Sequence, residues 1–167
     1  MSVFHEFDDV DAFTVGTVGR PGARTFYLQI RAGGDRLSVK CEKQQAAAIA
    51  QYLQKVLADL PPPEDRPIRG AMEMTAPEQV SFALGPIGLG FDRAADRVLV
   101  QLEELGDVNE AGEPIDDDRG HIRVHITRSQ AAAFVGHAEN VIESGRPDCV
   151  WCGSPMDPDG HYCPRMN

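Results

Sequence analysis

The chain has 167 residues, of which 42% are hydrophobic, and a formal net charge of −10 at pH 7. That apolar share is typical of a globular protein with a buried core. So acidic a balance repels a phosphate backbone and argues against nucleic acid as a partner. No apolar run is long enough to span a membrane, and the N-terminal MSVFHEFDDVDAF has none of the features of a secretory signal. We therefore expect a cytoplasmic protein.

The first predicted unit contains three strands and a helix. Strands are expected over 13–19, 25–30 and 36–41, where apolar side chains alternate with polar ones in the second and third. Residues 32–35 (AGGD) predict a tight hairpin between these two strands. The segment 45–57 has apolar residues at helical spacing. Cys41 continues the buried side of the third strand, so we expect an inert, buried thiol.

Proline residues mark the end of this unit. PPPEDRP follows Leu60, and neither a helix interior nor a central strand accommodates such a run. The sequence therefore predicts a stiff linker over 61–81.

The second predicted unit repeats the first in the same order. FTVGTVG (13–19) resembles FALGPIG (82–88), TFYLQI (25–30) resembles RVLVQL (97–102), RLSVKC (36–41) resembles HIRVHI (121–126), and QAAAIAQYLQKVL (45–57) resembles QAAAFVGHAENVI (130–142). Thr127 with Gln130 predicts a capping box at the second helix. Gly85, Gly88 and Gly90 could suggest a dinucleotide loop, but no helix follows them, which favours a structural role.

These blocks predict an α+β fold, with helices covering one face of the strands. We interpret it as a pseudo-twofold duplication of a β-β-β-α unit with a short C-terminal zinc-knuckle tail. The expected parts are a first repeat over 1–60, a proline-rich linker over 61–81, a second repeat over 82–145 and a zinc-binding tail over 146–167. The sequence does not decide between one continuous sheet and two packed sheets.

The tail contains the pattern C-x2-C-x8-H-x-C, formed by Cys149, Cys152, His161 and Cys163. Three thiolates and one imidazole are a usual tetrahedral zinc set, and four protein ligands make a closed, structural site. The alternatives are an iron–sulfur site, or a disulfide with a spare thiol. Zinc is favoured, because cysteines at short spacing in a reducing compartment tend to bind metal.

Three parts of the sequence together resemble a known family: FTVGTVGRPGARTFYLQ near the N-terminus, the QAAA helix, and the terminal CxxCGxPMDPDGHYCPR. The chain is similar to the actinobacterial family called domain of unknown function 3090, whose tail motif is zinc-ribbon-like. The family's usual proline after the first cysteine is absent, since Val150 and Trp151 fill the gap. The resemblance covers nearly the whole chain and implies no activity.

The favoured function is an interaction or regulatory module with a protein partner. The tail would present side chains common at interfaces, namely Trp151, Met156, Tyr162, Arg165 and Met166. Eight acidic residues and no Lys or Arg lie between Glu103 and Asp118, which suits either a solvated loop or a basic partner.

Two other functions stay open. An enzyme could use His121, Arg123 and His125, which share one side of a predicted strand. No nucleophile or paired carboxylate accompanies them, so we interpret them as an exposed strand face and name no catalytic residue. A nucleic-acid-binding zinc knuckle is the weaker alternative, because of the net charge.

Overall fold

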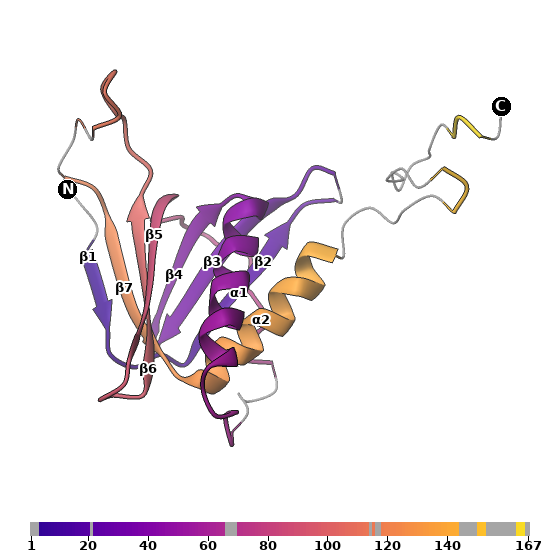
Figure 1. The fold of residues 1–167 in the computed structure, drawn as a ribbon. Coiled ribbons are helices and arrows are strands. Elements are labelled where there is room, and N and C mark those ends of the chain that lie inside the picture. The colour runs from indigo at the N-terminus through magenta and orange to yellow at the C-terminus, as the bar shows by residue number, and fades with distance from the viewer. Residues whose placement is uncertain are drawn as a thin grey trace.

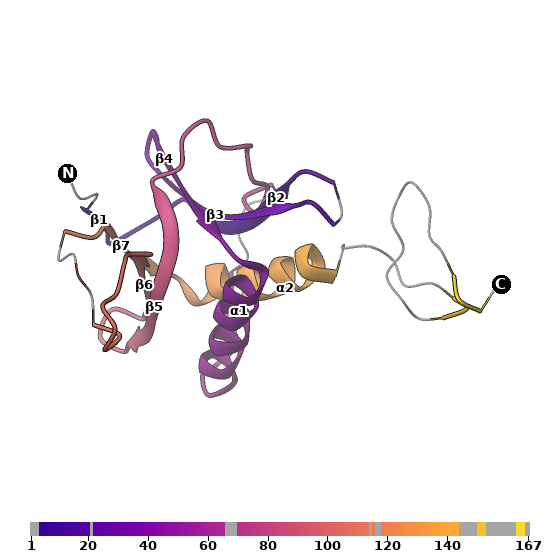
Figure 2. The same cartoon turned by 90° about the horizontal axis from the view of Figure 1, so that it is seen from above.

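The computed structural model describes residues 4–20, 22–65, 70–113, 115, 118–143, 150–152 and 163–165. Seven strands form one sheet in the order β1-β7-β6-β5-β4-β3-β2, and both helices lie on the same side of it (Figures 1 and 2). The α+β class is confirmed. The elements are β1 (Phe4–Phe7), β2 (Ala12–Val18), β3 (Thr25–Ala32), β4 (Asp35–Cys41), α1 (Lys43–Ala58), β5 (Phe82–Asp92), β6 (Arg97–Glu104), β7 (His121–Ile126) and α2 (Arg128–Glu143).

The two halves of the sheet have the same strand pairing. Strands β2-β3-β4 are antiparallel neighbours, as are β5-β6-β7, and the halves join through parallel β4 and β5. Leu28 pairs with Val39 in the first half, and Val100 pairs with Val124 in the second. The offsets of the sequence repeat predict this same correspondence. The duplication itself stays a prediction, which these matching registers support.

Strand β5 serves both halves of the sheet. Its first residues, Phe82 and Ala83, pair with β4, whereas Ile87 and the residues after it pair with β6. Leu84 also pairs with β6, and a register shift lies between it and Ile87. A Cβ atom on Gly85 would lie 2.8 Å from the Cα of Leu105, so a close backbone approach requires glycine there. The structural role expected for this glycine is confirmed.

Strand β5 pairs with a neighbour on each side, β4 and β6. In the first predicted repeat these two roles belong to separate strands, β1 and β2. Strand β1 pairs in parallel with β7, and β2 pairs with β3. Val15 then corresponds to Leu89, because Val15 pairs with Leu28 and Leu89 pairs with Val100. The sequence match placed Val15 on Leu84 and was wrong by five residues in this strand. The match aligned the Phe and Gly residues that the two segments share, and it could not account for the bulge in β5.

Each helix packs its apolar side on the sheet. The buried residues of α1 are Ala46, Ile49, Ala50 and Leu53, and those of α2 are Ala131, Phe134 and Ala138. The ring of Phe134 stacks on Phe13 of β2 at 4.8 Å between centroids. The predicted capping box of α2 is confirmed, because Thr127 N donates to Gln130 Oε1 and Gln130 N donates to Thr127 Oγ1.

Polar side chains of each helix bind strand carbonyls of the opposite half. His137 Nε2 of α2 lies 2.9 Å from Val15 O, and Tyr52 Oη of α1 donates to Leu89 O at 3.2 Å. These two contacts correspond, because Tyr52 and His137 have equivalent places in the repeat. Gln45 and Gln130 form a second such pair, donating to Leu84 O and Val10 O. The helices therefore bind the two halves to each other.

Residues 70–81, here called the strap, lie on the side of β2-β3-β4 that faces away from the helices. Thr14 Oγ1 donates to Met72 O at 2.6 Å, and Gln29 Nε2 donates to Thr75 O at 2.8 Å. Thr75 N donates back to Gln29 Oε1 at 3.1 Å. Thr14, Gln29 and Ser38 are consequently buried. This part of the expected linker is thus packed on the sheet.

Candidate functional site

The predicted metal site falls largely outside the described residues. Cys149 and His161 are not among them, whereas Cys152 is half-buried and Cys163 is buried. Within the described ranges, no group of three or more His, Cys, Asp or Glu side chains is placed to hold a metal ion. The zinc site on Cys149, Cys152, His161 and Cys163 therefore stays a prediction.

The predicted tail surface is described in part. Trp151 is 61% exposed and Val150 is 88% exposed, and both precede Cys152 directly. Arg165 is also exposed. Met156, Tyr162 and Met166 lie outside the described residues. Two large apolar side chains next to each other in solvent are typical of a contact surface.

His121, Arg123 and His125 share the outer side of β7, as the alternation predicted, while Ile122 and Val124 between them are buried. His121 Nδ1 lies 3.7 Å from a carboxylate oxygen of Glu103. His125 Nδ1 lies 3.6 Å from Asp8 Oδ1 and 3.4 Å from Phe7 O. These contacts join neighbouring parts of a partly exposed sheet face, and among the described residues none of them involves a hydroxyl or thiol nucleophile.

The Cys41 side chain is buried on the helix side of β4, as expected. Its lack of reactivity stays a prediction. Burial and, as a smaller contribution, the nearby Glu42 carboxylate together raise the pKa of the Cys41 thiol from its ordinary value of 9.0 to about 12. A thiol that keeps its proton at neutral pH is a poor nucleophile and a poor metal ligand.

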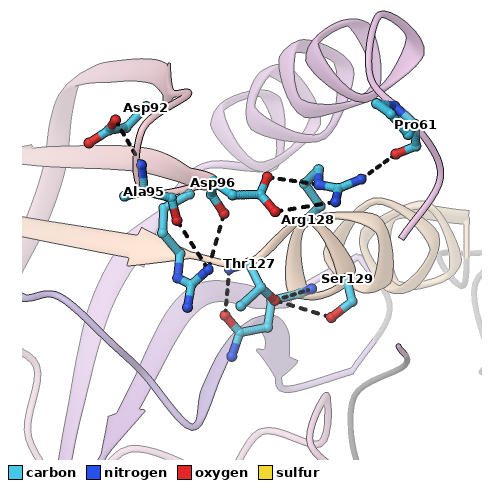
Figure 3. A network of polar contacts seen from close by, with 9 residues as sticks. Pro61, Asp92, Ala95, Asp96, Thr127, Arg128 and Ser129 are labelled. Atoms are coloured by element: carbon cyan, nitrogen blue, oxygen red, sulfur yellow. Dashed lines mark hydrogen bonds and ion pairs between the residues drawn. The ribbon is translucent and has the colours of Figure 1, made fainter. Parts of the chain in front are cut away.

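A polar cluster joins the β5–β6 hairpin to the start of α2 (Figure 3). Arg128 Nε donates to Asp96 Oδ1 at 2.9 Å, Arg128 Nη2 donates to Asp96 Oδ2 at 3.2 Å, and Arg128 Nη1 donates to Pro61 O. Asp96 has a φ of 50°, which the turn requires. Because the guanidinium group is engaged on three sides, we interpret this cluster as structural.

A cavity of about 540 Å³ lies where the β3–β4 hairpin meets the start of the strap. Arg31 and Arg36 line it together with Asp11 and Asp35. Two cations and two carboxylates at one open site favour no single class of ligand.

The outer face of the second half is here called the open face. It contains exposed Gly88 and Arg123 and half-buried Gly90, Leu99, Gln101 and His125. Its rows follow from strand pairing, since Gly88 pairs with Gln101 and Gln101 with Arg123. The matching row in the first half is Thr14, Gln29 and Ser38. The strap buries that row, whereas Gly88 and Arg123 are exposed among the described residues.

The sequence points to Arg123 with His125, and to Gly88 with Gly90, but does not indicate that these residues share one face. The available signal was the glutamine that occupies the same place in TFYLQI and RVLVQL, at Gln29 and Gln101. In each half, the second strand places a glutamine amide beside buried apolar residues, and such an amide requires hydrogen-bond partners.

The fold and these surfaces define an α+β protein with two matching half-sheets and, among the described residues, no catalytic constellation. A family model described as "Protein of unknown function (DUF3090)" matches residues 5–163. The chain belongs to this family, as the resemblance predicted. No curated protein and no solved structure matches the chain. No helix within the described ranges is long and apolar enough to cross a membrane.

Proposed function

We propose that the protein is a cytoplasmic interaction or regulatory module that binds a protein partner through the open face. The observation that carries this proposal is the difference between the two half-sheets. The outer face of the first half is buried by the strap, whereas the matching face of the second half has no such cover among the described residues. The second face has the same strand pairing as the covered face but no cover among the described residues, which suits it to binding a partner.

The second part of the proposal is a structural zinc ion held by Cys149, Cys152, His161 and Cys163. A segment of about twenty residues buries too little apolar surface to offset an ordering cost of about 1–2 kcal/mol per residue. Structural zinc contributes about 10–16 kcal/mol in small peptide sites at neutral pH. The exposed Trp151 beside Cys152 would then be held on a rigid turn where a partner can reach it.

The test is affinity purification of the full-length chain from its native cell, followed by mass spectrometry. It compares the wild type with Arg123→Glu on the open face, Cys152→Ser in the tail, and Gln54→Ala on α1 as a matched surface control. We expect one partner that the wild type and the control retain and that Arg123→Glu loses. A partner set unchanged by Arg123→Glu would contradict the role of the open face. Loss with Cys152→Ser alone would assign binding to the tail.

A further inference from the structure

We propose that the open face binds an extended peptide segment of another protein. The side-chain amide of Gln101 would pair with both backbone groups of one peptide residue. An unbranched apolar side chain of the preceding peptide residue, such as methionine, would lie over Gly90. This inference rests on the proposed function and names the chemistry of the partner.

The first half-sheet provides the pattern for this mode of binding. Gln29 Nε2 donates to Thr75 O at 2.8 Å and Gln29 Oε1 accepts from Thr75 N at 3.1 Å, so one side chain binds both backbone groups of one residue. The preceding residue, Met74, lies over Gly16. A Cβ atom on Gly16 would be 2.8 Å from Met74 Cβ, so this glycine makes the room that the methionine fills.

The second half-sheet has a glutamine and a glycine at the same positions, and no described segment lies over them. Gln29 pairs with Ser38 and Gln101 pairs with Arg123, while Gly16 pairs with Tyr27 and Gly90 pairs with Leu99. No hydrogen bond from the Gln101 amide to another described residue is formed. A Cβ atom on Gly90 would meet nothing within 4 Å. The Gln101 amide and the free space at Gly90 therefore have the same relative positions as the Gln29 amide and Gly16 beneath the strap, and both residues are half-buried.

Two substitutions between the halves adapt the open face to a separate ligand. Gly88 replaces Thr14, which removes the hydroxyl that binds Met72 O in the first half. Arg123 replaces Ser38 and adds a cation beside Gln101. Glu6 lies opposite Arg123 across β1 and β7 but makes no ion pair with it among the described residues. The arginine is thus available to a carboxylate of the peptide.

The chain's own described segments lie elsewhere. The strap is engaged on the first half-sheet. The described tail residues, 150–152 and 163–165, lie beyond the end of α2, on the opposite side of the molecule from β7, in both views (Figures 1 and 2). Neither the strap nor the described tail residues occupy the open face, and the occupant we propose is a segment of another protein.

The experiment titrates the isotope-labelled full-length protein with a synthetic peptide of the strap sequence, GAMEMTAPEQVS, and follows backbone amides by NMR. We expect shifts at Gly88, Gly90 and Gln101. Gln101→Ala should weaken binding about tenfold, since it removes two hydrogen bonds. Gly90→Val should abolish binding by filling this free space. The control Gln54→Ala should bind like the wild type.

Absence of shifts on the open face at millimolar peptide would overturn the inference. Binding by Gln101→Ala and by Gly90→Val that is as strong as binding by the wild type would also overturn it. Nuclear Overhauser contacts between Gln101 and the chain's own tail, without peptide, would make the tail the occupant and would also overturn it. If the peptide fails while a native partner is still lost with Arg123→Glu, the proposed function stands and only this inference falls.

Discussion

His137 Nε2 lies 2.9 Å from the carbonyl oxygen of Val15, so a helix of the second half is hydrogen-bonded to a strand of the first. Tyr52 makes the corresponding bond to Leu89 in the other direction. Because each helix is bound to the opposite half, we expect the two halves to unfold together in a single transition.

His137→Leu should lower the free energy of unfolding by about 1–3 kcal/mol, because the Val15 carbonyl loses a partner where the surroundings are partly buried. Tyr52→Phe, whose hydroxyl bond is exposed, should cost less, about 0.5–1.5 kcal/mol. Urea denaturation followed by circular dichroism measures both. Equal and negligible effects would show that these bonds do not couple the halves.

Gln29→Ala should destabilise the protein by about 2–4 kcal/mol, since it leaves the Thr75 amide and carbonyl without their partner beneath the strap. Gln101→Ala is the matched control. Its side chain binds no other described residue, so we expect a change of about 0.5 kcal/mol or less. Limited proteolysis should cleave the strap faster in Gln29→Ala alone. Cleavage at the wild-type rate would contradict the contact.

The Cys41 thiol should resist alkylation in the native protein at pH 8 and react only after unfolding. Its folded pKa of about 12 is above the ordinary value of 9.0. The folded state therefore keeps a proton that the unfolded state loses, and stability should fall as pH rises from 9.0 towards 12. Cys41→Val should remove this part of the alkaline slope. A native thiol that reacts as quickly as free cysteine would disprove the burial.

Asp96→Asn should cost about 1 kcal/mol or less in low salt, because the Arg128–Asp96 pair is partly exposed to solvent. Asparagine also tolerates the positive φ of this position, so the turn should persist. The difference from the wild type should shrink in high salt as the charges are screened. If salt does not change the loss of stability, that loss comes from the turn rather than from the ion pair.

Cys152→Ser should abolish zinc binding, measured by elemental analysis of the purified protein, and should make the tail sensitive to proteases. The two-half core should keep its melting temperature, because its buried residues lie between Val10 and Ala138, apart from Cys163 in the tail itself. Purified wild type without zinc would refute the site. Equal loss of the core and the tail would refute their independence.

The features that depend only on residues close by in the sequence were predicted correctly. The Ala32–Asp35 hairpin, the Thr127–Gln130 capping box and the burial of Cys41 depend on neighbours a few residues away. The α+β class followed from periodicities of the same kind.

Features that depend on distant partners were not predicted. Strand β1 was missed because FHEF is short and half-exposed and is held by β7 near the end of the fold. Ser38 and Gln29 lie on the polar side of the strand alternation and are nevertheless buried, because the strap crosses them. Nothing in the strand pattern itself indicates that a segment rich in Met and Pro will cover its polar side.

The pairing of Phe4 with His121 also has a consequence for synthesis on the ribosome. Among the described residues, β7 is the sole neighbour of β1 in the sheet, so Phe4–Phe7 have no strand partner until residues 121–126 have been synthesised. Sequence-distant closure of this kind slows folding.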